Sequence, residues 1–207
     1  MGFGENVAIV SIITPTFRRS PVVVQRCIGC VLLQTMQDWE QIVCSDGEKE
    51  GIMERLVAVM GDNRVRYRFL GEKKDGDFGN NVRQRMLIEE AKGKYVVFLD
   101  DDNIIMPDFL TSMVNALDVS GADFAVCSIV YVYPDRWSAP NKPPILLCGV
   151  PVANGQTDPL QIMVRIEVMK EVGWNVDGGY NADGEVFDRL GEKYKHVKVD
   201  GVLGVHL

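Results

Sequence analysis

The sequence predicts an α/β protein in which helices cover both faces of a doubly wound sheet. Short apolar, β-branched runs alternate along the chain with segments of helical periodicity, as in successive βαβ units. One run, residues 95–99, is apolar throughout, which is typical of a strand buried on both faces. A length of 207 residues suits one domain with a substantial core. Right-handed crossovers between the parallel strands are expected.

The first half of the chain reads as strands separated by helices. Strands are expected at 7–13, 41–44, 65–70 and 95–99, and helices at 21–34, 51–60 and 80–92. A polar loop, residues 14–21, follows the first strand and ends in Ser20 and Pro21, a suitable N-cap and first-turn pair. Gly93 stands where a C-cap glycine would end the third helix.

The second half is less regular. Helices are expected at 107–119, at 162–172 and from residue 182, and strands at 124–133 and 197–205. Between them, residues 134–151 are rich in proline, which resists both helix and sheet. Long irregular segments are often functional, so this one is either a lid or acceptor-binding loop, or simply a solvated connection.

Composition restricts the class of protein. A formal net charge of -7 argues against nucleic-acid binding, which needs a basic surface. No apolar run approaches the length of a transmembrane span, and no cleavable signal peptide is visible. The five cysteines, without a secretory signal, favour reduced thiols in a cytoplasmic protein. Cys27 and Cys30 lie in an apolar helical pattern and are expected to be buried.

Three consecutive carboxylates, Asp100 to Asp102, directly follow the central apolar run. Ionised carboxylates repel one another and need partners, water or a cation. Oxygen donors suit Mg2+ or Mn2+, and ligands of α/β sheets bind beyond the carboxyl ends of the strands. The alternative is that Asp102 and Asn103 are only turn or capping residues ahead of a helix. Ile105 occupies the place of the glycine that an EF-hand loop requires.

Several motifs, in this order, resemble those of the inverting family 2 glycosyltransferases with the GT-A fold. They are the first-strand segment 13–17 (Ile-Thr-Pro-Thr-Phe), segment 44–47 (Cys-Ser-Asp-Gly), segment 91–102, which ends in the family's DxD motif, and segment 107–110 (Pro-Asp-Phe-Leu). The resemblance covers nearly the whole chain. It implies one GT-A domain over 1–207 with a mixed sheet, a Rossmann-like nucleotide-sugar-binding half at 1–103 and an acceptor-binding half at 104–207.

The resemblance also assigns donor-binding residues. The nucleobase is expected to bind at Thr14, Pro15 and Thr16, and Asp46 is expected to bind the base or the ribose. Asp100 or Asp101 is expected on the ribose. The metal site, for Mn2+ or Mg2+, is assigned to two residues, Asp102 and His206. The alternative for His206 is a surface histidine close to the terminus.

The catalytic base is assigned to Asp183 in the late acidic motif, with Glu185 as the alternative base. Ala182 replaces the glutamate that usually precedes this aspartate. Asp183 is otherwise a simple helix N-cap. Arg83 or Arg85 is expected to add positive charge near the diphosphate; Arg85 stands where the family usually has asparagine, and it can instead pair with Glu89 at i,i+4.

These assignments imply a metal-dependent inverting transferase. A UDP- or GDP-sugar would give its sugar to a carbohydrate or glycoconjugate hydroxyl in a single displacement. One alternative is a non-catalytic nucleotide-sugar-binding module. The other is a sugar nucleotidyltransferase, which would want a glycine-rich basic loop near the N-terminus; residues 14–19 contain no glycine.

Overall fold

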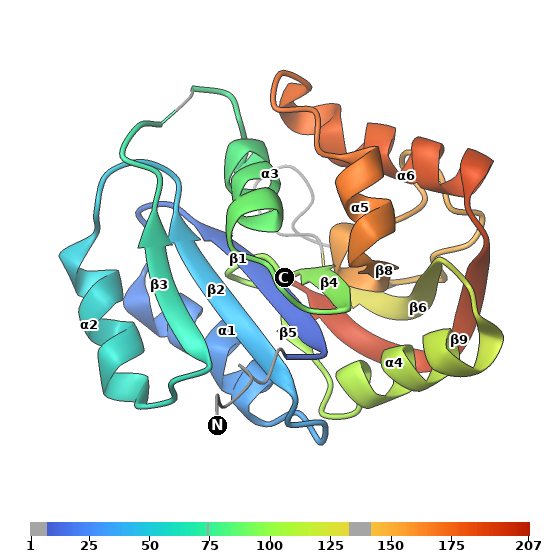
Figure 1. The fold of residues 1–207 in the computed structure, drawn as a ribbon, viewed down its shortest axis with the longest axis horizontal. Coiled ribbons are helices and arrows are strands. Elements are labelled where there is room, and N and C mark those ends of the chain that lie inside the picture. Colours follow the sequence, from blue (N-terminus) through green and yellow to red (C-terminus); the bar gives the residue numbers. More distant parts are fainter. Residues whose placement is uncertain (1–7, 74, 133–141) are drawn as a thin grey trace, which may run out of the picture.

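The computed structural model describes residues 8–73, 75–132 and 142–207. Within them, nine strands form one mixed, twisted sheet with helices on both faces (Figure 1). The strand order is β3-β2-β1-β4-β8-β6-β9-β5, and β7 pairs with β6 outside this path. The predicted α/β class is therefore confirmed. Across the described ranges, none of the helices has both the length and the apolar character needed to span a bilayer.

The first half is a parallel, Rossmann-like unit. Its elements are β1 (Val10–Thr16), α1 (Pro21–Leu32), β2 (Trp39–Ser45), α2 (Gly51–Met60), β3 (Val65–Phe69), α3 (Asn80–Glu89) and β4 (Tyr95–Phe98). The β1 strand lies in the middle of this unit, parallel to β2 on one side and β4 on the other. All seven residues of β1 are buried, because helices cover both sides of it.

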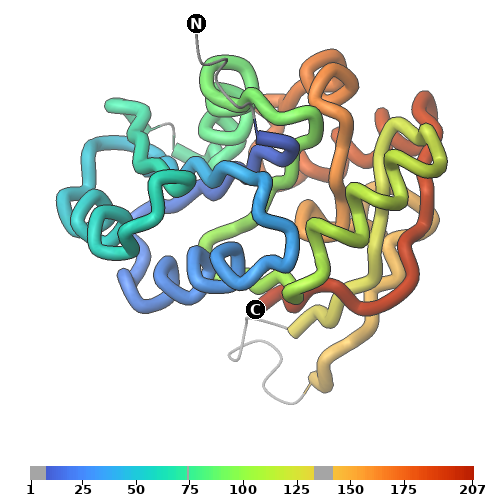
Figure 2. The backbone as a smooth tube through the Cα atoms, turned by 60° about the horizontal axis from the view of Figure 1, so that its bottom comes forward, coloured from blue at the N-terminus to red at the C-terminus, as the bar shows by residue number. Residues whose placement is uncertain are grey.

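The second half extends the sheet with antiparallel and parallel strands. Its elements are β5 (Ile104–Ile105), α4 (Phe109–Ser120), β6 (Phe124–Tyr131), β7 (Ile145–Leu147), β8 (Ile162–Arg165), α5 (Ile166–Val172), α6 (Ala182–Lys193) and β9 (His196–His206), with short 3-10 turns at Pro159–Gln161 and Gly179–Asn181. The junction between the halves is antiparallel, because β8 pairs with β4. Short β5, which follows β4 in the chain, pairs with the end of β9. This pairing brings the last residues of the chain close to the end of β4 (Figure 2).

The core has two layers, one on each face of the sheet. Helices α1, α2 and α4 cover one face, where Phe109 and Trp39 are fully buried. Helices α3, α5 and α6 cover the other, around Phe98 and Phe187 (Figure 1). Cys27 and Cys30 are buried in the first layer and form no disulfide, as their apolar surroundings predict. Burying both faces leaves the strand ends as the places where polar side chains can gather.

Several predicted boundaries are wrong. Residues 14–16, expected in a loop, extend β1, because Thr14 to Thr16 stay paired with β2. The helix expected at 162–172 begins at Ile166, because residues 162–165 pair with β4 and β6 as a strand. A short apolar run cannot by itself distinguish these two structures. The proline-rich segment contains β7, and its residues 134–141, on which the expectation of a lid or acceptor-binding loop partly falls, lie outside the described ranges.

The expected helix-end signals also differ from the structure. Ser20 makes no side-chain capping hydrogen bond, although Pro21 does begin α1. The α3 helix ends at Glu89, before Gly93. Gly93 instead lets two backbone segments approach: its N–H donates to Ser11 Oγ at 2.8 Å, and a Cβ there would lie 2.6 Å from Ser11 N. A close approach, not a cap, requires this glycine.

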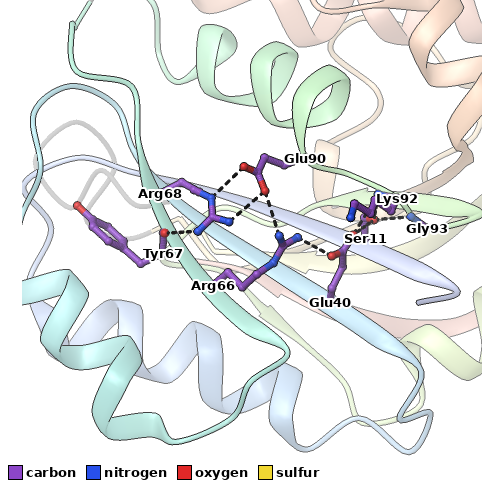
Figure 3. A network of polar contacts seen from close by, with 8 residues as sticks. All are labelled: Ser11, Glu40, Arg66, Tyr67, Arg68, Glu90, Lys92 and Gly93. Carbon is purple, nitrogen blue, oxygen red and sulfur yellow. Dashed lines mark hydrogen bonds and ion pairs between the residues drawn. The ribbon is translucent and has the colours of Figure 1, made fainter. Parts of the chain in front are cut away.

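A network of charged side chains fastens β2, β3 and the end of α3 on the outer part of the sheet (Figure 3). Glu90 accepts from Arg68 Nε at 2.9 Å and from Arg66 at 3.0 Å. Arg66 also donates to Glu40 at 2.6 Å, and Glu40 accepts in turn from Ser11 Oγ at 2.7 Å. The arginines that alternate along β3 are therefore paired, and they join a strand to the helix above it.

Candidate active site

A cleft of about 460 Å3 opens at the carboxyl ends of β1, β2 and β4, where the two halves of the sheet meet. The strand ends bring polar residues there because the three strands are parallel and in register. Most of the residues predicted for the site line this cleft: Pro15, Thr16, Asp46, Arg83, Asp100, Asp101, Asp102, Asp183 and His206.

Thr14 and Arg85 do not line the cleft. Thr14 is buried within the sheet, where its Oγ1 accepts from Gln41 Nε2 at 3.0 Å. Arg85 Nε donates to Glu89 at 3.1 Å, which is the surface pairing that the i,i+4 spacing allows. Residues two apart on a helix point in different directions, so Arg83 and Arg85 cannot both face the cleft. The expectation of a donor-binding Arg85 is corrected in favour of Arg83.

The three aspartates pair with two arginines from different parts of the chain, so their negative charge is only partly offset. Arg19 Nε donates to Asp101 at 2.9 Å, and its NH2 group donates to Asp102 at 3.0 Å. Arg83 pairs with Asp100. Asp101 is buried, and this burial raises the pKa of its carboxyl despite the opposing effect of Arg19. Asp100 and Asp102 keep 30% and 28% of their side chains exposed, so they are the accessible members of the motif.

His206 reaches the cleft because β9 runs beside β5, with Val205 opposite Ile104. Its Nδ1 lies 2.9 Å from Asp158 Oδ2, and its ring stacks on Tyr131 with 4.3 Å between the centroids. Burial lowers the pKa of the imidazole, but Asp158 and the more distant carboxylates outweigh burial and raise it overall. A histidine so held has a fixed ring orientation.

Asp102 and His206 offer a carboxylate and an imidazole, a donor set that fits Mn2+ or Mg2+. In the described part of the chain, no three acidic, histidine or cysteine side chains converge as a ready-made cation cluster. The two side chains nevertheless line one cleft with five further aspartates. Oxygen atoms of a bound diphosphate would be hard ligands of the same kind.

The part of the cleft next to β2 contains Asp46, which directly follows this strand and is buried. Its Oδ2 lies 3.6 Å from Lys73 Nζ, while its Oδ1 has no hydrogen-bond partner among the described residues. Burial raises the pKa of this carboxyl. Lys73 Nζ also sits 3.4 Å from the centroid of the Phe17 ring. Arg83 Nε and Trp174 Nε1, which belong to the same cleft, are buried without a partner too.

Buried polar atoms in proteins are nearly always hydrogen-bonded. Among the described residues, four such atoms without a partner belong to this cleft, with Thr16 Oγ1 as the fourth, and they are therefore expected to have partners in a bound molecule or in water. They include an acceptor, at Asp46, two donors, at Arg83 and Trp174, and the Thr16 hydroxyl, which can both donate and accept. This mixture suits a ligand that carries both hydrogen-bond donors and anionic oxygens.

Asp183 is the second residue of α6 and is half-buried at the far side of the cleft. Its Oδ1 accepts from the Gly184 N–H at 2.7 Å. Burial raises the pKa of this carboxyl, and nearby Arg83 only partly offsets the effect. Glu185 is exposed, lines no part of the cleft and accepts from Asn175 at 2.8 Å. The geometry thus presents Asp183 to a ligand and turns Glu185 away.

Sequence reasoning missed Arg19, Asp158, Lys73 and Trp174. Arg19 had a weak signal, as a basic residue in a polar segment after the first strand. Asp158 had a stronger one: it precedes Pro159 and caps a 3-10 turn, with Oδ1 accepting from the Leu160 N–H at 2.9 Å. Its second oxygen, however, faces a histidine 48 residues along the chain only because β6 and β9 are neighbours.

Comparison with known proteins agrees with this geometry. The family described as Glycosyl transferase family 2 matches residues 11–169. Glycosyltransferase GlyG of Streptococcus pneumoniae serotype 4 is 29% identical over 119 residues, which is 57% of this chain and 38% of GlyG. The first 349 residues of TarS from S. aureus share the fold, with a TM-score of 0.76, 13% identity and coverage of 95% of this chain and 60% of that one. TarS has also been solved with UDP and with UDP-GlcNAc.

A third similar structure is the mannosyltransferase PcManGT from Pyrobaculum calidifontis, solved in complex with GDP-Man and Mn2+. Its TM-score is 0.70 at 17% identity, and the alignment covers 97% of this chain and 57% of that one. The present chain thus spans less than two thirds of each of these proteins. Since the family match extends over most of the 207 residues, the chain belongs to glycosyl transferase family 2.

Proposed function

We propose that this protein is a metal-dependent inverting glycosyltransferase that moves a sugar from a nucleotide-diphosphate sugar to an acceptor hydroxyl. The observation that carries the proposal is the single cleft that unites the aspartate motif, the unpartnered Asp46 and Arg83 atoms, and Asp183. The structurally similar proteins solved with UDP-GlcNAc and with GDP-Man make a UDP- or GDP-sugar the expected donor.

The donor would lie along the carboxyl ends of the parallel strands. Pro15, Thr16 and the free oxygen of Asp46 would contact the nucleoside, and Asp100 or Asp101 the ribose. Arg83 would face the diphosphate, because its Nε is unpartnered and its guanidinium already lies beside Asp100. A planar guanidinium is well suited to phosphate oxygens.

Asp102 and His206 would hold the cation, with Asp158 fixing the orientation of the imidazole. When bound there, a divalent cation supplies Lewis-acid stabilisation of the departing diphosphate. Arg19 now holds Asp102, so we expect it to turn toward the phosphates or solvent when the donor and cation bind.

Asp183 would act as the general base. As the acceptor oxygen bonds to the anomeric carbon, its proton passes to the Asp183 carboxylate, and the bond from that carbon to the diphosphate oxygen breaks. One displacement inverts the anomeric centre, so no covalent nucleophile is required. A raised carboxyl pKa makes Asp183 a stronger proton acceptor than an ordinary surface aspartate.

The test is a screen of UDP- and GDP-sugars by thermal shift, with and without Mn2+, followed by measurement of nucleoside diphosphate release. A specific donor should raise the melting temperature only with the cation present, because a ligand of the native state stabilises it by mass action. Slow release of nucleoside diphosphate should accompany binding. Binding without any release or transfer would instead favour a non-catalytic sugar-nucleotide-binding module.

A further inference from the structure

A second cleft, of about 320 Å3, adjoins the first on the far side of Asp183. The two clefts share four lining residues: Tyr131, Asp158, Tyr180 and Asp183. A group bound in the second cleft would therefore meet a donor in the first at the Asp183 carboxylate. Its volume is at the lower end of the range, roughly 300–1,000 Å3, that small-molecule sites occupy. It suits a single sugar-sized group.

The lining combines flat apolar surfaces with neutral hydrogen-bonding groups. Aromatic rings come from β6 (Tyr131) and from the turn before α6 (Tyr180), while Phe187 of α6 lies fully buried beneath the cleft. The amides of Asn154, Gln156 and Asn181 can both donate and accept. Rings pack against the C–H faces of a pyranose, and amides pair with its hydroxyls, so this lining suits a polyhydroxylated ring.

The charge of the lining is also informative. Two carboxylates, Asp158 and Asp183, border the second cleft, and no lysine or arginine does so within the part of the chain that the structure describes. The N-terminus of α6 would by itself favour an anion. That tendency is opposed by Asp183, which takes the Gly184 N–H, and by Glu185 in the same first turn. An anionic group in this cleft would face repulsion without a compensating cation.

Residues 154–158 form one wall of the second cleft, and the segment that leads into this wall, residues 152–154, is held against α6 by close contacts. The Asn154 N–H donates to Asp188 at 2.8 Å. Gly184 leaves space for the Asn154 side chain, since a Cβ there would lie 2.3 Å from Asn154 Oδ1. Gly191, two turns later, leaves space for the Val152 carbonyl oxygen in the same way, also at 2.3 Å. The wall is thus a defined part of the fold.

We propose that the second cleft binds the acceptor and selects an uncharged sugar or cyclic polyol over a uronate or phosphate-bearing one. This inference rests on the glycosyl transfer proposed above, because it takes Asp183 as the base that receives the acceptor proton. The attacking hydroxyl would point to Asp183, while its ring packs between Tyr131 and Tyr180.

The experiment compares matched acceptors. Methyl glucoside, galactoside and mannoside are each paired with the corresponding methyl uronide, which differs only in carrying a carboxylate at C6. Saturation-transfer NMR measures binding to the purified protein, with and without Mn2+ and the nucleoside diphosphate. Transfer from the identified donor gives kcat/KM for each acceptor. At least one neutral glycoside should bind, and its kcat/KM should exceed that of its uronide by about tenfold or more.

Two variants test the electrostatic origin of the preference. Gln156→Lys adds a cation to the exposed rim of the second cleft. It should reduce the ratio of kcat/KM for a neutral glycoside to that for its uronide several-fold. Asn115→Lys adds the same charge on α4, which lines neither cleft, and should leave the preference unchanged. Equal or better use of the uronides by the native protein would overturn the inference, as would absence of binding by every neutral glycoside or a preference that Gln156→Lys leaves unaltered.

The outcomes also separate the two proposals. A protein that releases nucleoside diphosphate from no sugar nucleotide contradicts the proposed function. The saturation-transfer measurement needs no donor turnover, so it still decides which class of acceptor the second cleft binds. A protein that hydrolyses a donor but prefers uronides leaves the proposed function standing and removes the acceptor inference alone.

Discussion

At the scale of single residues, Asp183 combines two properties that a general base needs. It is accessible from both clefts, and burial raises the pKa of its carboxyl above the ordinary value of 3.8. Glu185, two residues later, has neither the position nor the burial. Since both belong to the same helical turn, they form a natural pair for comparison.

We expect Asp183→Asn to fold normally and bind the donor with nearly unchanged affinity, because the amide keeps the size and the hydrogen bond to Gly184. Transfer should fall by about a hundredfold or more, the usual range for losing a general base. Single-turnover transfer and donor titration measure the two properties. Glu185→Gln is the matched control; if it loses transfer while Asp183→Asn keeps it, the base lies two residues further on.

The same residue predicts a pH dependence. The base works only when ionised, so the single-turnover rate with saturating donor and cation should fall as pH drops through the raised pKa of Asp183. The fall should begin at a higher pH than an ordinary aspartate would give. A rate that stays constant down to pH 4, with the protein still folded by circular dichroism, would speak against this role.

At the scale of elements, the ends of strands position the site and helices fix its walls. The α6 helix shows how this is done, because two of its small residues allow segment 152–154 to lie against it. An added methyl group meets different neighbours at the two positions. At Gly184 it meets the end of the Asn154 side chain, and at Gly191 it meets the backbone oxygen of Val152.

We expect Gly191→Ala to destabilise the protein. The added methyl group would collide with the backbone oxygen of Val152, and a backbone segment cannot move aside as easily as a side chain can. The loss should be about 1–3 kcal/mol, in the range of overpacked sites. Gly184→Ala should cost less, since Asn154 can rotate and alanine has the higher helix propensity. Urea unfolding of both variants gives the comparison. Equal stability of the two would contradict the close contact at Val152.

The network around Glu90 is a second element-scale feature, since it ties β3 to the end of α3 (Figure 3). The hydrogen bond from Arg68 lowers the pKa of Glu90, with further contributions from the charges of Arg68, Arg66 and Lys92. A carboxyl whose folded-state pKa is depressed stabilises the fold above its unfolded-state pKa. That stability is lost as pH falls through the folded-state pKa.

Glu90→Gln should therefore lower the free energy of unfolding at pH 7 by about 1 kcal/mol, a value suited to a partly exposed charged network. The difference from the native protein should be smaller at pH 3 than at pH 7, because the pH there is closer to the lowered folded-state pKa of Glu90. Urea unfolding at both pH values measures it. Glu171→Gln, which breaks the exposed pair with Lys193, serves as the control and should change stability much less. A Glu90→Gln difference that grows at low pH would contradict the sign.

At the scale of the whole molecule, the first half of the fold could be predicted from local patterns, and the second half only in part. Helix α2 was predicted at residues 51–60, as observed, because periodicity and a following glycine define it. Strands β5, β7 and β8 were not predicted, because they are two to four residues long and exist only by pairing with distant strands. Local sequence carries almost no signal for such pairing.

The residues of the site fall into the same two groups, those that local sequence predicts and those that only the folded sheet brings together. Asp46, Asp102 and Asp183 could be predicted as residues of the candidate site because each stands in a recognisable local motif. All three line the cleft. Arg19 and Asp158 could not, since their partners lie 82 and 48 residues away and meet them only in the folded sheet. Arg85 is an intermediate case. Its spacing from Glu89 made the observed pair possible, but the spacing alone could not show that Arg85 points away from the cleft.

His206 depends most on the whole fold, because β9 must cross the second half before its last residues reach Asn103 beside β5. His206→Ala should weaken Mn2+-dependent binding of a nucleoside diphosphate by about tenfold or more, since an imidazole donor would be lost from the cation. Binding measured in EDTA should change little. His196→Ala, at the opposite end of the same strand and outside both clefts, is the matched control. Isothermal titration of the three proteins decides the matter: if His206→Ala keeps the full Mn2+ dependence while remaining folded, the histidine is not a ligand and the cation must be held by carboxylates alone.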